Sequence, residues 1–199
     1  MKNTRPDFEV WKKYISEFPP GYQNITYHMI IDVKMGKCFR RKARFVVDGH
    51  KTNTPTAIAY SSVVSRDSIR IALTIEVLND LDVLACDIQN NYISAHRRER
   101  VWVVAGIEFG SEAGNNMLAG NDLYGLNSSG AALRAFLAET LEKMGYRHSY
   151  ADPDLWLRPE VKPYGFNYHE YILCYVKYVL YISNNLRKSM KRIQEDFKL

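Results

Sequence analysis

Val83-Leu84-Ala85-Cys86-Asp87-Ile88-Gln89-Asn90-Asn91-Tyr92 is the stretch that decides the fold expected for this 199-residue chain. Its first half is apolar, which predicts a short buried strand. The strand ends by placing the carboxylate of Asp87 where the run turns polar. A strand end holds an acid rigidly enough to bind a metal ion, but such a carboxylate also serves to cap the next turn. Both interpretations stay open on this stretch alone.

The composition narrows the class of protein. A net charge of +5 permits a polyanionic partner without demanding one. The length suits one domain or two subdomains that share a core. The three cysteines show neither zinc-site spacing nor a disulfide framework, which favours an intracellular protein of the cytoplasm or nucleus. No apolar run is long enough to span a bilayer, so no membrane partner is expected.

Apolar periodicity and turn residues predict the remaining strands. Residues 107–121 have no period and are expected to form a loop. The order of the elements suits an α+β fold whose sheet has helices on one face. The expected strands are Ile25–Val33, Cys38–Val47, Val101–Val104, Asp154–Arg158, Tyr168–Val176 and Val179–Ser183.

Two helices have clear signals. The first is expected to begin at a cap residue, Asp67 or Ser68, and to run to about Leu78. The second carries an apolar stripe over about 130–144 and stops at Gly145. This stripe is expected to be core.

The second expected strand is strongly basic, with four cations at Arg40, Arg41, Lys42 and Arg44. Charge on both faces of a strand is costly to bury, and it suits a finger that faces phosphate groups. A solvated edge hairpin protected by its charge explains the same pattern. The residues alone leave both possibilities open.

Seven stretches, taken together and in this order, resemble the reverse transcriptase domain of copia-type LTR retrotransposons, an RNA-directed DNA polymerase and nucleotidyltransferase. The resemblance covers about residue 37 to the C-terminus, and its specificity comes from seven motifs in register. The stretches are Arg41–Val46, Val63–Arg70, Leu81–Tyr92, Leu123–Leu126, Ser128–Ala132, Ala151–Leu157 and Tyr171–Ser183.

The resemblance implies the fingers and palm of the right-hand polymerase architecture, the palm being an antiparallel sheet backed by helices. Residues 1–23 would form an N-terminal arm and residues 24–80 a fingers-like subdomain with the basic hairpin. Residues 81–199 would form a palm-like subdomain that stops before a thumb. The implied partners are an RNA or DNA template–primer, a dNTP and the rest of a retrotransposon polyprotein.

The resemblance also implies a metal site. Asp87 takes the position of the aspartate that binds both catalytic metal ions, which in the family are Mg²⁺ or Mn²⁺. The backbone carbonyl of Ile88 would also face a metal ion.

A nucleotide site is implied by the same resemblance. Tyr92 takes the position of the aromatic gate under the incoming sugar. Tyr124 and Gly125 match the motif beside the nucleotide and template. Arg44, together with Lys42, matches the finger cations that hold the triphosphate.

One departure from the family pattern bears on activity. The second carboxylate motif of the family reads Tyr-x-Asp-Asp at the tip of a hairpin, and here Lys177 and Tyr178 replace both aspartates at that tip. Polymerisation needs two Mg²⁺ about 3.5–4 Å apart, bridged by anionic oxygens. At about 4 Å and an effective dielectric constant of 20, an ammonium and a divalent ion repel by roughly 8 kcal/mol. We expect Lys177 to pair with Asp87 or to turn to solvent, and the metal pair to be lost.

Two other functions are compatible with the sequence. One is a non-catalytic nucleic-acid-binding module that uses the basic strand and a second basic turn at Arg97, Arg98 and Arg100. Sheet tyrosines would stack on bases in such a module, although half-buried tyrosines more often serve packing. The other is an inert retroelement relic. The tyrosines concerned are Tyr168, Tyr171, Tyr175 and Tyr181.

Overall fold

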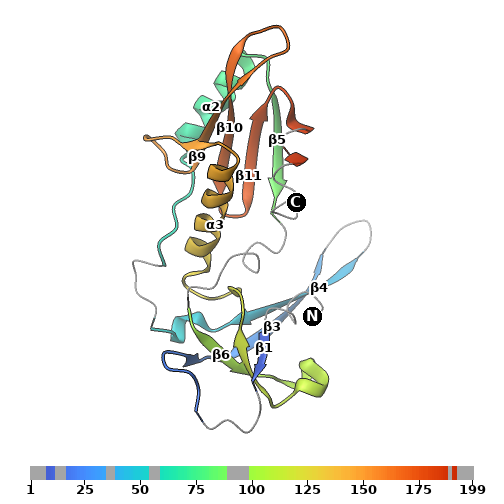
Figure 1. The fold of residues 1–199 in the computed structure, drawn as a ribbon. Coiled ribbons are helices and arrows are strands. Elements are labelled where there is room, and N and C mark those ends of the chain that lie inside the picture. Colours follow the sequence, from blue (N-terminus) through green and yellow to red (C-terminus); the bar gives the residue numbers. More distant parts are fainter. Residues whose placement is uncertain are drawn as a thin grey trace. The chain divides into compact units, whose positions relative to one another are not determined.

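The computed structural model describes residues 8–11, 17–34, 39–53, 59–88, 99–187 and 190–191. The chain divides into two compact units, 1–60 with 92–132 and 61–91 with 133–199. Both contain strands, and the helices confirm the expected α+β class (Figure 1). The boundaries of these two units differ from those of the three parts expected from the sequence. The three-part division stays a prediction.

The first unit contains a four-stranded sheet of order β1-β7-β6-β2. Its strands are β1 (Phe8–Trp11), β2 (Gln23–Asn24), β6 (Val101–Val104) and β7 (Asn116–Ala119). The loop expected over residues 107–121 is therefore wrong, because this segment holds both β7 and a 3-10 helix, η4 (Ile107–Glu112). The four residues of β7 are too few to show a period in the sequence, and they pair with both neighbouring strands.

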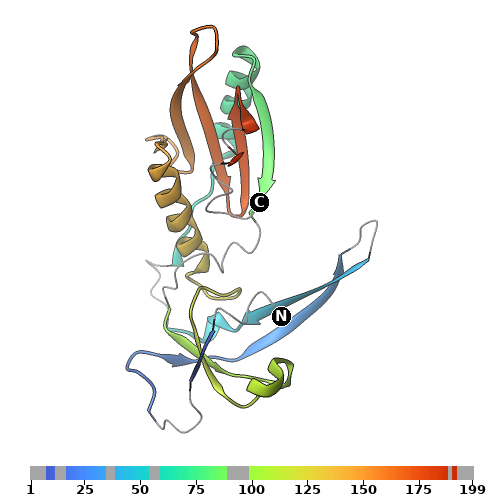
Figure 2. The same cartoon turned by 45° about the vertical axis from the view of Figure 1, so that its right-hand side comes forward.

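The basic strand lies in a two-stranded antiparallel ribbon of β3 (Tyr27–Lys34) and β4 (Arg40–Val47), close to the bounds expected from the sequence. One end of the ribbon packs in the core of the first unit through Phe45 and Val47. The other end reaches beyond the sheet (Figure 2), where Ile31 is 75% exposed. Residues 35–38, between the two strands, lie outside the described residues.

The second unit is built on a five-stranded sheet of order β5-β11-β10-β9-β8, antiparallel throughout. Its helices are α2 (Arg66–Leu78) and α3 (Ser129–Lys143), of which the residues from Leu133 onward belong to this unit. The strands are β5 (Asp82–Asp87), β8 (Arg147–His148), β9 (Leu155–Val161), β10 (Asn167–Tyr175) and β11 (Tyr178–Ser183).

The two helices cover opposite faces of this sheet (Figures 1 and 2), so the expectation of helices on one face is wrong. Leu137 and Leu141 of α3 pack with Ile172 of β10. Ala72 of α2 packs with Leu173, the next residue of the same strand. Because successive side chains of a strand point to opposite faces, a strand that is apolar at consecutive positions needs cover on both.

The helix ends are set by specific contacts. The cap of α2 is Ser65 and not Asp67 or Ser68; the Ser65 hydroxyl accepts a hydrogen bond from the Ser68 amide. After α3, Gly145 takes a φ of +85° as expected. Its amide and that of Tyr146 bond back to the last turn of the helix, which is the usual glycine-ended helix stop. Among the described residues, no helix is long and apolar enough to cross a membrane.

Asp152 anchors the start of α2. Its carboxylate accepts hydrogen bonds from the Ser65 amide at 2.8 Å and the Ser68 hydroxyl at 2.6 Å. The next acid, Asp154, is buried and accepts hydrogen bonds from Arg134 and Ser62. No local pattern in the sequence marks these contacts, because the partners lie more than 80 residues upstream or in α3.

Acid is expected to weaken the second unit through Asp152. Burial opposes ionisation of this carboxyl, but hydrogen bonds from Ser68, Ser65 and Asp154 outweigh it and lower its pKa. A carboxyl with a lowered folded-state pKa contributes stability above its unfolded pKa of about 4 and loses it as the pH falls through the folded pKa. Urea unfolding measured from neutral pH to below about pH 4 should therefore show a steeper acid loss in the parent than in Asp152→Asn. Parallel pH profiles would contradict this.

A second buried polar cluster lies between α3 and the sheet. The carboxylate of Glu170 accepts hydrogen bonds from Tyr146, Arg158 and Ser183. The Tyr146 and Tyr181 hydroxyls also bond to each other, at 2.9 Å. All these side chains are buried, so their hydrogen bonds offset the cost of placing a charge pair inside the unit.

At the far end of α2, Lys162 closes the helix. Its ammonium donates to the main-chain carbonyls of Asn79 at 2.6 Å and Asp80 at 2.9 Å, and the residue is only 3% exposed. A cation at this position complements the negative end of the helix dipole.

The sequence predicts that the strand ending at Asp87 is buried, and this prediction is wrong. β5 forms an edge of the five-stranded sheet, and most of its residues are exposed or half-buried. Its apolar run is real, but burial depends on the position of the strand in the sheet, which the run itself does not encode.

Candidate active site

The hairpin of β10 and β11 carries the residues that the resemblance assigns to the second carboxylate motif. Tyr175 pairs with Tyr178, so the turn between them consists of Val176 and Lys177. The sequence predicts Lys177 and Tyr178 at the tip of the hairpin. The turn lies one residue earlier, because Tyr178 already pairs with Tyr175 in the ladder. Val176 has a φ of 54°, a conformation that a β-branched residue adopts only at a cost.

Strand register brings Asp87 to this hairpin. β5 pairs with β11 so that Asp87 lies opposite Tyr178. The amide of the next residue, Ile88, donates to the carbonyl of Lys177 at 2.9 Å. Residues 90 positions apart in the chain are thus held side by side by main-chain hydrogen bonds.

Lys177 and Asp87 form an ion pair. The Lys177 Nζ lies 3.1 Å from one carboxylate oxygen of Asp87 and 3.3 Å from the other. Their side chains are 39% and 50% exposed, so solvent screens the pair. The same ammonium lies 4.7 Å from the ring centroid of Tyr178. The hydrogen bond to Asp87, with smaller contributions from Tyr178, raises the pKa of Lys177. Of the two arrangements expected for Lys177, the structure has the pairing with Asp87.

The two cations that the resemblance assigns to the triphosphate lie on the ribbon of the first unit. In the register of the two strands Lys42 lies opposite Asp32 and Arg44 lies opposite Ile30. Residues two apart in a strand share a face, so both cations lie on one face of the ribbon. Arg41 falls on the opposite face, so the ribbon carries positive charge on both sides as expected. Lys42 is exposed and Arg44 half-buried.

Tyr124 and Gly125 pack against the base of this ribbon. The Val47 amide donates to the Tyr124 carbonyl at 2.8 Å, in a bridge between β4 and the segment before α3. Gly125 has a φ of +100°, and a Cβ there would lie 2.0 Å from the Val47 carbonyl oxygen. Only glycine fits, so the contact fixes this motif to the end of the cationic strand.

Residues 8–199 match the protein family described as reverse transcriptase (RNA-dependent DNA polymerase). The chain belongs to the reverse transcriptase family. A search of curated proteins found no match. Family membership confirms the coarser part of the resemblance, namely a reverse transcriptase domain, from a family whose members work on nucleic acid and nucleotides.

Reverse transcriptases generally use Mg²⁺ or Mn²⁺, and the atoms around Asp87 can be tested against that need. Divalent ions prefer carboxylate oxygens, whereas the side-chain group bound to the Asp87 carboxylate among the described residues is the ammonium of Lys177. One carboxylate that is already paired with a lysine does not fit a pair of divalent ions. Across the described ranges, no three or more His, Cys, Asp or Glu side chains gather into a metal-binding group.

The other predicted residues of the reverse transcriptase site are spread over the chain. Asp87, Lys177 and Tyr178 belong to the second unit, and Lys42, Arg44, Tyr124 and Gly125 to the first. Tyr92, the expected sugar gate, lies outside the described residues, as do Arg97 and Arg98 of the expected basic turn.

A buried acid that the sequence did not single out supports the Gly125 segment. Glu99 accepts a hydrogen bond from Thr52 at 2.7 Å and from the Ser128 amide at 2.9 Å. It thereby ties the segment between Gly125 and α3 to the loop after the ribbon. In the sequence Glu99 is one acid among arginines, and no local signal marks it as buried.

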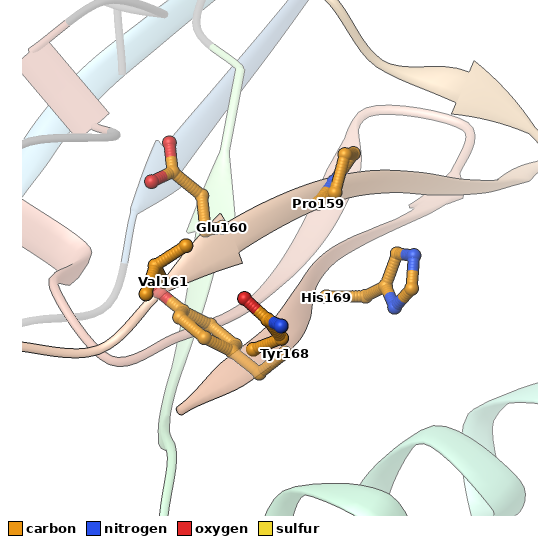
Figure 3. A pocket seen from close by; sticks show the side chains of 6 residues that line it. Pro159, Glu160, Val161, Tyr168 and His169 are labelled. Carbon is orange, nitrogen blue, oxygen red and sulfur yellow. The ribbon is translucent and has the colours of Figure 1, made fainter. Parts of the chain in front are cut away.

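The pocket in Figure 3 is separate from these residues. It has a volume of about 210 Å³ and lies between the far ends of β9 and β10. At about 3.3 Å per residue, the start of β10 is roughly 25 Å from its Tyr175 end. Glu160 and His169 point apart (Figure 3), so they do not converge on a ligand. The lining residues are Pro159, Glu160, Val161, Asn167, Tyr168 and His169.

Proposed function

We propose that this chain is the reverse transcriptase domain of a copia-type retrotransposon and that it does not polymerise DNA. The seven motifs in register support the copia-type lineage, and the family match spans nearly all of the chain. In this proposal residues 24–80 are fingers-like and residues 81–199 palm-like, behind an N-terminal arm of residues 1–23. The antiparallel sheet with an acid at the end of β5 supports the palm assignment.

The ion pair between Lys177 and Asp87 carries the proposal of inactivity. A metal ion that approaches Asp87 has to displace the ammonium and then remain close to it. The repulsion of roughly 8 kcal/mol at 4 Å, halved by solvent screening, still exceeds the binding energy of one exposed carboxylate. With a lysine and a phenol at the positions of the Asp-Asp pair, the remaining donors cannot bridge two ions.

The roles assigned to the nucleotide site are part of the same proposal. Lys42 and Arg44 would contact phosphate groups of a dNTP or template, and their place on one face of the ribbon, with Lys42 exposed, supports this. Gly125, with Tyr124, would lie beside the nucleotide, and Tyr92 would contact its sugar. The partners are then a template–primer, a dNTP and the rest of a retrotransposon polyprotein.

The test is to restore the lost carboxylates and measure metal binding. The Lys177→Asp/Tyr178→Asp variant should bind Mn²⁺ or Mg²⁺ at least about tenfold more tightly than the parent, because two anions replace a cation and a phenol. Calorimetric titration gives the affinity and stoichiometry, and primer extension on an RNA template is run in parallel.

The matched control is Lys177→Asn/Tyr178→Asn, which removes the cation and adds no carboxylate. It should bind the metal ion somewhat more tightly than the parent, because the repulsion by the ammonium is gone, but clearly more weakly than the Asp-Asp variant, because only one carboxylate is present. Two tight divalent sites in the parent, or primer extension by the parent as fast as by the Asp-Asp variant, would refute the proposal of inactivity.

Retained nucleic-acid binding would distinguish a working binding domain from an inert relic. If the ribbon holds phosphate groups, affinity for a template–primer should fall steeply with salt, and Lys42→Gln should lower the slope by about one unit. Filter binding at several salt concentrations gives that slope. Affinity that is independent of salt would favour the relic.

A further inference from the structure

The two edges of the five-stranded sheet differ in how they are protected. β8 is only two residues long, and a very short edge strand offers little for another chain to pair with. β5 is six residues long and contains neither proline nor lysine. A regular, largely exposed edge strand of this length is a template for strand addition.

The direction of the free main-chain groups follows from one hydrogen bond. The Ile88 amide donates to the carbonyl of Lys177. In an antiparallel ladder every second residue directs its amide and carbonyl to the same neighbour, so those of Leu84 and Cys86 are directed to β11 as well. The amides and carbonyls of Val83, Ala85 and Asp87 therefore point away from the sheet. In the part of the chain that the structure describes, no main-chain hydrogen bond reaches them from that side.

β5 is complementary to itself. Three outward-pointing residues pair fully in an antiparallel ladder in only one way, with Ala85 on the two-fold axis. Val83 then lies opposite Asp87 of the second copy, so no two acids face each other. The smallest side chain of the strand stands where the two chains meet.

Exposed apolar side chains shortly before β5 in the sequence, and one within it, favour burial of this region. Val77 and Leu78, in the last turn of α2 before β5, are 74% and 78% exposed, and Val83 is 37% exposed. A six-residue strand pair by itself buries less than a stable interface needs. These residues would add to the area.

We propose that β5 pairs antiparallel with β5 of a second copy of this chain, centred on Ala85. The main chain of Asp87 then bonds to Val83 of the second copy, and the two sheets join into one. The inference does not depend on the proposed function.

A cross-link at one position tests the register. In this ladder Leu84 forms a non-hydrogen-bonded pair with Cys86 of the second copy, a pair whose Cα atoms lie about 4.5 Å apart and within disulfide reach. With Cys38→Ser as background in the full chain, Leu84→Cys should yield a disulfide-linked dimer under mild oxidation. Val83→Cys points to the other face and should not.

A disruption variant tests the interface without relying on the cross-link. Ala85→Lys would place two lysines opposite each other on the axis and should raise the dimer dissociation constant about tenfold or more. Because Ala85 is exposed, folding should be unaffected, and circular dichroism melting checks this. Sedimentation velocity over a concentration series measures the dimer.

A parent chain that stays monomeric at every concentration would overturn the proposal. So would a dimer that Ala85→Lys leaves unchanged. Cross-linking through Val83→Cys but not through Leu84→Cys would overturn the register and with it the proposed pairing.

Discussion

Gly125→Ala is expected to lower the unfolding free energy of the first unit by roughly 3–5 kcal/mol. Two costs add. The residue has a φ of +100°, which alanine adopts under strain. Its new Cβ would lie 2.0 Å from the Val47 carbonyl oxygen, so the bond between Val47 and Tyr124 would have to open. The loss is measured by urea unfolding, with hydrogen exchange of amides in the first unit as the probe.

Gly114→Ala is the matched control. Gly114 lies in the same unit with a φ of +82°, and nothing lies within 4 Å of the place that a Cβ would take. It therefore carries the conformational cost, about 1 kcal/mol, without the clash. Equal losses in the two variants would show that the contact between Gly125 and the ribbon is not needed.

Glu170→Ala is expected to cost about 3–5 kcal/mol in the second unit. Removal of the carboxylate takes away the shorter of the two ion pairs of the buried Arg158 guanidinium and leaves the half-buried Glu160, at 3.3 Å, as its ion-pair partner. The Ser183 hydroxyl also loses its acceptor. A buried charge that loses its main partner is among the larger single penalties in a folded protein. Denaturant unfolding with the midpoint and slope fitted together measures it.

The double variant Arg158→Met/Glu170→Leu separates the charge from the fold. Replacing both partners with apolar residues of similar size should recover most of the lost stability, because nothing charged stays buried. If the double variant is as unstable as Glu170→Ala, the loss comes from packing and not from the stranded guanidinium.

Elements with a long, regular pattern could be predicted from the sequence. The stripe of α3, the stop at Gly145 and the hairpin of β10 and β11 were all placed within one or two residues. β7 was missed because four residues show no period. The exposure of β5 was missed because burial depends on strand order, and an apolar run is the same in an edge strand and in a central one.

The candidate site divides in the same way. The meeting of Asp87 with Lys177 followed from a resemblance that aligned two motifs 90 residues apart. Neither the sequence nor the resemblance predicted the anchoring roles of Glu99, Asp152 and Glu170, because each acid acts through a partner that is remote in the chain. No local pattern distinguishes a buried acid with distant donors from an acid in a solvated turn.

Lys162 gives the second unit a built-in chemical reporter. Its amine is enclosed by the carbonyls of Asn79 and Asp80, so an acylating reagent reaches it only after the C-terminal end of α2 lifts from the sheet. The rate at which Lys162 is labelled, measured by mass spectrometry relative to exposed lysines such as Lys51, then reports how often the structure near β5 opens locally.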